Sequence, residues 1–132
     1  MLFVDTSYWI ALRHRRDVNH EAAVELARNH RGVPLATSNL VLGETWSMIR
    51  RRDGHRAAVD WLDRVAGGIA VRPHRVDPAV EDEAWAWLRI HDERPYSFVD
   101  ATSFTLMRRL RLTEALAFDA DFAAAGFVEL RP

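Results

Sequence analysis

The sequence contains neither cysteine nor lysine, and all 18 of its basic residues are arginine. The lack of cysteine excludes disulfide bonds, thiolate zinc sites and cysteine nucleophiles, and it fits a reducing compartment. The lack of lysine excludes a phosphoacceptor receiver domain, which needs an essential lysine. No apolar run is long enough to span a membrane, and the first residues lack the basic-then-apolar pattern of a signal peptide. We therefore expect a cytoplasmic protein with no membrane segment.

The chain also carries little net charge, −1 over 132 residues, so its total charge does not attract nucleic acid. Arginine forms bidentate bonds to phosphate, which suits a nucleic-acid ligand. The abundance of alanine favours a simpler explanation, a compositional bias of the genome. The length predicts one domain over residues 1–132, large enough to bury roughly two-thirds of the surface that the unfolded chain exposes.

Strands alternate with helices along the chain. Short apolar runs predict strands, and apolar residues spaced three and four apart predict helices. The predicted strands cover residues 2–5, 32–38, 69–74, 114–118 and 127–130. The predicted helices cover residues 6–15, 20–30, 38–52, 55–67, 78–93 and 97–110, with Asn19 and Asp77 as caps of the second and fifth. This order predicts an α/β fold with a largely parallel sheet.

Four acids lie in apolar surroundings. Asp5 ends the first strand in "LFVD", and Asp119 ends a later one in "LAFD". Glu44 shares a helix face with apolar residues in "SNLVLGETWSMIRRR", and so does Asp100 in "YSFVDATSFTLMRRL". A carboxylate on a core-facing stripe is costly unless something pairs with it. The carboxyl ends of parallel strands are where such sheets bind ligands, so all four acids can meet at one edge.

Each acid also has a purely structural interpretation. Asp5 and Asp119 are placed to cap the helix or turn that follows, and Ser97 with Asp100 has the spacing of a capping box. Glu44 could instead pair with an arginine, although no arginine lies beside it in the sequence. The sequence leaves both interpretations open for each acid.

Convergence of these acids would have a direct electrostatic consequence. Two carboxylates about 4 Å apart repel by roughly 4 kcal/mol at an effective dielectric constant of about 20. Several of them in one pocket either take up protons or bind a cation. A site made only of oxygen ligands favours Mg²⁺ or Mn²⁺ over zinc or copper, and such ions serve phosphoryl chemistry.

The order and spacing of four segments resemble a PIN domain of the VapC toxin type. These segments are "LFVDTSYWIAL", "LVLGETWSMIRRR", "YSFVDATSFTLMRRL" and "ALAFDADFAAAGF", and the resemblance extends from Leu2 to Leu130. It implies a three-layer α/β/α fold with a central, mostly parallel sheet. It also implies a metal-dependent endoribonuclease that hydrolyses RNA and acts as the toxin of a type II toxin–antitoxin module. A VapB-like antitoxin and a homodimer are the partners that the resemblance implies.

The family's functional positions can be matched to this sequence one by one. Asp5 and Asp100 match the principal metal-binding aspartates, Glu44 the second acid and Asp119 the fourth, so these four are the predicted catalytic and metal-binding residues. Asp121, two residues later in "DADF", is the alternative for the fourth position. Thr6, Ser7 and Ser97 match hydroxyl positions that support the site in the family, and they are equally suited to capping helices.

Two other functions remain open at this stage. A haloacid-dehalogenase-like phosphatase also has an aspartate at the end of its first strand, but it needs a second aspartate two residues later, where this chain has Ser7. A catalytically idle PIN module that only binds a partner would not need all four acids. Arginines 50–52, at the end of the helix that carries Glu44, are either contacts for RNA or cations matched to the helix dipole.

Overall fold

The computed structural model describes residues 1–68 and 70–132. Within them the strands are β1 (Leu2–Val4), β2 (Leu35–Ser38), β3 (Val71–His74), β4 (Glu114–Leu116) and β5 (Val128–Glu129). The helices are α1 (Thr6–Arg13), α2 (His20–Asn29), α3 (Asn39–Asp53), α4 (His55–Gly67), α5 (Pro78–Ile90), α6 (Phe98–Arg109) and α7 (Asp121–Ala124). None of the helices in these residues is both long and apolar enough to cross a membrane.

The strands form one sheet in the order β3-β2-β1-β4-β5, and every neighbouring pair is parallel. The central strand β1 pairs with β2 on one side, where Phe3 lies opposite Ala36, and with β4 on the other, where Phe3 lies opposite Ala115. Parallel strands need crossover connections, and the helices supply them. The predicted α/β fold with a parallel sheet is confirmed.

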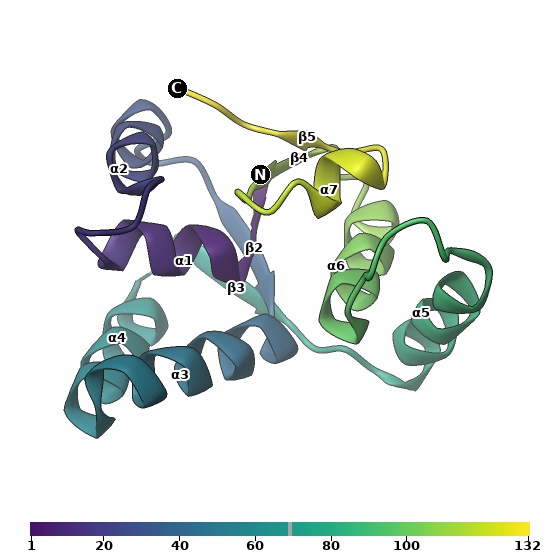
Figure 1. Cartoon of the computed structure of the whole chain (residues 1–132), viewed down its shortest axis with the longest axis horizontal. Coiled ribbons are helices and arrows are strands. Elements are labelled where there is room, and N and C mark those ends of the chain that lie inside the picture. Colours follow the sequence, from purple (N-terminus) through teal and green to yellow (C-terminus); the bar gives the residue numbers. More distant parts are fainter. Residues whose placement is uncertain (69) are drawn as a thin grey trace.

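The direction in which the chain crosses the sheet places the helices on its two faces. From β1 through β2 to β3 the chain moves one way with α1 to α4 as connections, and from β3 to β4 and β5 it moves back with α5 to α7. Right-handed crossovers therefore put α1 to α4 on one face and α5 to α7 on the other (Figure 1). The chain leaves β1 and β4 towards opposite faces, so the space beyond their carboxyl ends is the topological switch point of the sheet.

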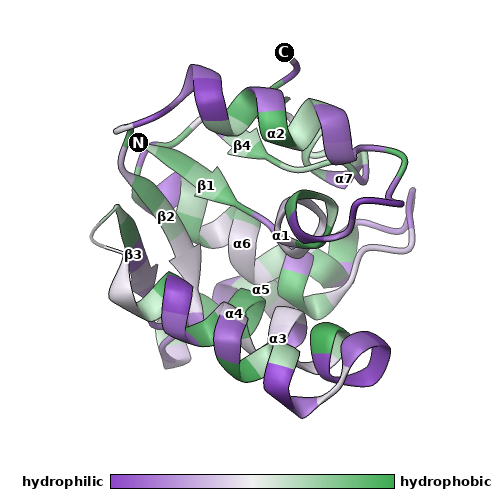
Figure 2. Cartoon of the chain, turned by 90° about the vertical axis from the view of Figure 1, so that its left-hand side faces the viewer, coloured by the Kyte–Doolittle hydropathy of each residue, from purple (hydrophilic) through white to green (hydrophobic). Residues whose placement is uncertain are grey.

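Apolar side chains fill both interfaces between sheet and helices. Phe3 and Val4 of β1 are fully buried, as expected for a central parallel strand that is covered on both faces. Phe104 of α6 and Phe122 of α7 pack edge to face, with ring centroids 4.9 Å apart. Figure 2 shows the hydrophobic β1 in the middle of the fold and hydrophilic residues along the outer turns of α3 and α4. This core packs around β1 and β4, whose carboxyl ends lead to the candidate site.

Several predicted boundaries are wrong by a few residues. The first helix was predicted to continue to residue 15, but α1 ends at Arg13 because His14 adopts an extended backbone conformation. Asp53, at the end of α3, lies within ion-pair distance of both Arg13 (3.5 Å) and His14 (3.2 Å). The end of α1 therefore lies against the end of α3, a tertiary contact that the local sequence of α1 does not reveal.

The fifth helix and the fourth strand are also shorter than predicted. Helix α5 ends at Ile90, before an extended His91, instead of reaching residue 93. Strand β4 ends at Leu116, so two residues separate it from Asp119. Helix α7 was not predicted as a helix, because its four residues are too few for a periodic pattern. The predicted strand 69–74 begins at Ile69, which lies outside the described residues.

Candidate active site

Asp5 is the first residue after β1 and the N-cap of α1. Its Oδ2 accepts hydrogen bonds from the Ser7 backbone N–H at 3.1 Å and from the Ser7 hydroxyl at 2.6 Å. Its own N–H donates to the carbonyl of Leu116 at 3.1 Å, which extends the pairing of β1 with β4. The capping interpretation is therefore correct, and the carboxylate is 3% exposed. A structural and a functional role for this acid do not exclude each other.

Asp100 lies in the first turn of α6, where it completes a capping box with Ser97. Its Oδ2 accepts from the Ser97 N–H at 2.9 Å, and the Ser97 hydroxyl accepts from the Asp100 N–H at 3.0 Å. The box predicted from the sequence is confirmed. It fixes the side-chain rotamer of an aspartate that, as a whole residue, is only 9% exposed.

Asp119 lies in the loop between β4 and α7. Its Oδ1 accepts a hydrogen bond from the Asp121 N–H at 3.1 Å, which closes a short turn. Asp121 instead forms an ion pair with Arg94, with both the Nε and an Nη of the guanidinium 2.9 Å from Oδ1. Of the two candidates for the fourth acid, Asp119 is the one without a cationic partner among the described residues.

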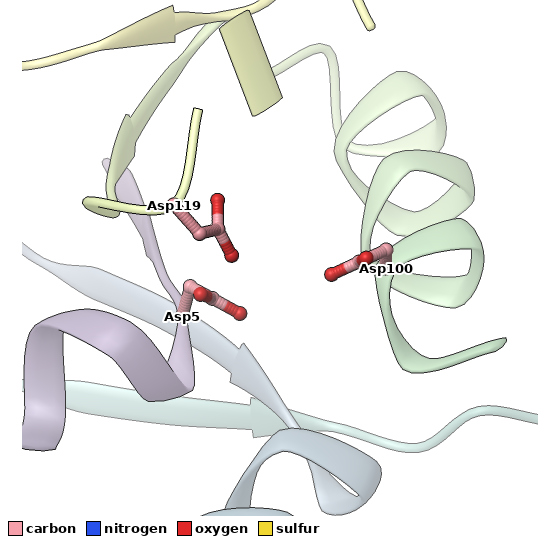
Figure 3. A group of neighbouring side chains, drawn as sticks. All are labelled: Asp5, Asp100 and Asp119. Atoms are coloured by element: carbon pink, nitrogen blue, oxygen red, sulfur yellow. The ribbon is translucent and has the colours of Figure 1, made fainter. Parts of the chain in front are cut away.

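The fold brings three of the four predicted acids together. Asp5, Asp100 and Asp119 each offer a carboxylate oxygen within 4.8 Å of the others. Figure 3 shows them pointing into one space from the end of β1, from the loop after β4 and from α6. This space is the switch point of the sheet. Glu44 lines the same cavity of about 320 Å³ but does not belong to this group.

Burial and mutual repulsion raise the pKa values of the three acids. Burial, and next the charge of Asp119, raise the pKa of Asp100 to about 6. Burial, and next the charge of Asp5, raise the pKa of Asp119 to about 7. Burial also raises the pKa of Asp5, against the lowering effect of the Ser7 hydrogen bonds. Without a bound cation, the three aspartates therefore keep protons at pH values well above those at which aspartate usually loses its proton.

This donor set fits a hard divalent cation. It consists of carboxylate oxygens, and among the described residues none of the three acids forms an ion pair with an arginine or histidine. A bound cation would replace the protons and remove the repulsion that raises the pKa values. Oxygen-only ligation is typical of Mg²⁺, Ca²⁺ and Mn²⁺. The group can therefore bind a divalent metal ion.

Two residues near the site were missed at the sequence level. Glu129 of β5 accepts a hydrogen bond from the Ala120 N–H at 3.0 Å, and Arg131 donates one to the carbonyl of Ala117 at 2.9 Å. Both contact the loop that carries Asp119. Glu129 stands in the apolar run "FVEL", and an acid in apolar surroundings was the pattern that identified Glu44. Nothing local marks Arg131, whose contacts are tertiary.

Comparison with known proteins identifies the family. The PIN domain family matches residues 2–128. The chain is 52% identical to the 23S rRNA-specific endonuclease VapC20 of Mycobacterium tuberculosis, from strains CDC 1551 / Oshkosh and H37Rv, over 100% of this chain and 99% of that protein. It also resembles the crystal structure of M. tuberculosis VapC20, described as a Sarcin-Ricin loop cleaving toxin. That match has a TM-score of 0.92 and 48% identity and covers 100% of both chains.

The chain therefore belongs to the PIN domain family and, within it, to the VapC type. This confirms the resemblance found in the sequence, and the relationship extends over the whole length of the chain. Membership of this family sets aside the phosphatase alternative, in agreement with the serine at position 7.

Proposed function

We propose that this protein is an endoribonuclease toxin that hydrolyses a phosphodiester bond of 23S rRNA, at the sarcin–ricin loop, and so inhibits translation and growth. The convergence of Asp5, Asp100 and Asp119 carries the proposal, because it supplies the acidic site that the reaction needs. The substrate is proposed from the names of the VapC20 relatives, which match the chain from end to end.

In this proposal Asp5, Asp100 and Asp119 hold Mg²⁺ or Mn²⁺, and Glu44 completes the site from the α3 side of the cavity. A divalent ion bound there supplies the positive charge that activates water and offsets the charge of the phosphodiester. The chain contributes rigidity: the Ser7 hydroxyl orients Asp5, and the Ser97 capping box orients Asp100. Pre-positioned ligands lose little freedom on binding, which favours both affinity and correct geometry.

Arg52 is the residue we propose to bind the RNA backbone beside the acids. Glu44, Met48 and Arg52 line the cavity from α3. They are spaced four residues apart, so Arg52 lies about 12 Å from Glu44 along the helix axis at a rise of 1.5 Å per residue. Among the described residues Arg52 has no carboxylate partner. A phosphate further along the strand from the scissile one can pair with this guanidinium.

The test is cleavage of intact ribosomes by the purified protein, with Mg²⁺, with Mn²⁺ or with a chelator, and with the cut ends mapped by primer extension. We expect one discrete, metal-dependent cut in 23S rRNA and none with Asp5→Asn or Asp100→Asn. If 23S rRNA in the ribosomes stays intact while total transfer or messenger RNA, incubated separately with the protein, is cut, the proposed substrate is wrong. Undiminished cutting by both variants would overturn the site.

Asp121→Asn is the matched control for Asp119→Asn. Each substitution removes one carboxylate, from Asp119 in the loop or from Asp121 at the start of α7, but Asp121 is paired with Arg94 and lies outside the group of three acids. We expect Asp119→Asn to abolish cleavage and Asp121→Asn to retain it. If Asp121→Asn abolished cleavage and Asp119→Asn retained it, Asp121 and not Asp119 would be the fourth acid of the site. A wild-type protein that binds metal but cuts no RNA would support the idle-module alternative.

We also propose the partners that a VapC-type chain implies, a VapB-like antitoxin and a second copy of the chain. Co-purification of the two proteins from a two-gene expression vector tests the first, and light scattering of the isolated chain tests the second. A cytoplasmic location and a single domain over residues 1–132 likewise stay predictions. Fractionation of cells and limited proteolysis test them.

A further inference from the structure

The loop 117–120 carries Asp119 and has no strand or helix of its own to hold it. Strand β4 ends at Leu116 and α7 begins at Asp121. Ala120, in this loop, has a φ of +67°, a left-handed conformation that costs a residue with a Cβ roughly 1 kcal/mol or more. Tertiary contacts must therefore hold the loop in this shape.

Residues of the C-terminal segment supply such contacts on one side of the loop. Glu129 lies in β5, beside β4, and its Oε1 accepts from the Ala120 N–H at 3.0 Å. Arg131 donates from Nη1 to the carbonyl of Ala117 at 2.9 Å, and its guanidinium carbon lies 5.0 Å from the centre of the Phe118 ring. Arg131 Nη2 and Glu129 Oε2 are 3.8 Å apart. The two side chains therefore bind the loop at both ends and pair with each other.

The Glu129 side chain of this pair is buried, so its contact with the loop belongs to the packed part of the structure. The Glu129 side chain is only 5% exposed, and the Arg131 side chain is 50% exposed. On the opposite side of the loop the Phe118 N–H donates to the Ser7 hydroxyl at 3.0 Å. Figure 1 shows the segment with β5 running along β4 and over α7. The loop is held between Ser7 and the Glu129–Arg131 pair.

We infer that Glu129 and Arg131 are positioning residues that hold the loop 117–120 so that Asp119 faces Asp5 and Asp100. This inference rests on the proposed metal-binding role of Asp119 only for its functional consequence. The geometric part, that these two side chains hold the loop, stands on the contacts alone.

Hydrogen exchange measured by NMR tests the geometric part without metal and without RNA. In Glu129→Ala and in Arg131→Ala we expect the Ala120 and Phe118 amides to exchange roughly tenfold faster or more. Glu129→Gln keeps an acceptor for the Ala120 N–H and should largely restore slow exchange. Arg56→Ala is the control, since it removes an arginine from an exposed pair with Asp60 on α4. Unchanged exchange of the loop amides in both alanine variants would overturn the inference.

Metal affinity tests the functional part through a double-mutant cycle. In the otherwise wild-type protein, we expect Arg131→Ala to weaken Mn²⁺ binding roughly tenfold. Isothermal titration calorimetry measures the affinity. In an Asp119→Asn background the same substitution should have no further effect, because the ligand that it positions is already lost. Equal losses in both backgrounds, or loss of stability alone with unchanged affinity, would mean a merely structural role. A wild-type protein that binds no Mn²⁺ would overturn the proposed function, whereas hydrogen exchange would still decide the geometric part.

Discussion

The Ser7 hydroxyl donates to Oδ2 of Asp5 at 2.6 Å. The Ser7 hydroxyl oxygen in turn accepts a hydrogen bond from the Phe118 N–H at 3.0 Å, in the loop that also carries Asp119. One hydroxyl thus connects the ends of β1 and β4 at the switch point of the sheet. The sequence suggested a supporting role for Ser7, and its contacts agree with that expectation.

Removal of this hydroxyl should weaken the site from both sides. We expect Ser7→Ala to lower the free energy of unfolding by about 1–3 kcal/mol, because the Phe118 N–H loses its acceptor and Asp5 loses a donor. Metal affinity and cleavage should fall as well, since Asp5 becomes freer to rotate. Urea denaturation and Mn²⁺ titration measure the two effects. Ser47→Ala, at an exposed position of α3, is the control, and an equal effect at both serines would contradict the prediction.

Stability in the absence of metal should decrease as the pH rises. The folded-state pKa is about 6 for Asp100 and about 7 for Asp119, whereas aspartate in an unfolded chain titrates at about 3.9. The folded state therefore binds more protons between about pH 4 and pH 7, and its stability falls over that range. Thermal denaturation in chelator across this range should show a steeper decline for the wild type than for Asp119→Asn. Parallel curves would mean that the pKa of Asp119 is not raised in the folded protein.

Added Mg²⁺ should reverse this trend, because only deprotonated carboxylates bind the ion. We expect the rise in melting temperature on adding Mg²⁺ to be larger at about pH 8 than at about pH 5.5. The same denaturation series with and without Mg²⁺ measures it. A pH-independent increment would indicate binding elsewhere on the surface.

Asp100→Asn should separate folding from chemistry. Asparagine keeps a side-chain oxygen that can accept from the Ser97 N–H, so the start of α6 should survive. We expect the metal-free protein to be as stable as the wild type or more so, because one repelling charge is removed. Cleavage should fall by roughly 100-fold or more, since the substitution removes one of the proposed metal ligands. A clearly lower free energy of unfolding would show that the capping box of Ser97 and Asp100 requires a carboxylate at position 100.

Arg52→Ala should weaken substrate binding more than catalysis. We expect KM for RNA to rise roughly five- to tenfold while kcat changes little, because a charge-assisted contact to the RNA backbone is lost. The dependence of log KM on log salt should become shallower by about 0.7–0.9. Steady-state cleavage of a short RNA measures both. Arg50 lies on the same helix turn but outside the cavity lining, so Arg50→Ala should leave KM and its salt dependence unchanged.

Residues that act through their own neighbours in the sequence were predictable. Asp5 as a cap and the box of Ser97 with Asp100 depend on contacts two or three residues away, so the spacing alone indicated them. The parallel sheet followed from the alternation of strands and helices. The predicted end of α1 was wrong. Arg13 and His14, at this end, lie within ion-pair distance of Asp53 of α3, a residue far away in the sequence.

The sequence by itself determined the fold class, the family and which acids lie in apolar surroundings, because these depend on local periodicity and on the order of motifs. Only the tertiary structure decided which acids meet. It placed Asp119 beside Asp5 and paired Asp121 with Arg94, and it left Glu44 in the cavity lining but outside the group of three acids. It also revealed the contacts of Glu129 and Arg131. The reason is physical: a carboxylate's state depends on the charges and donors within a few ångströms, and the chain folding back upon itself supplies them.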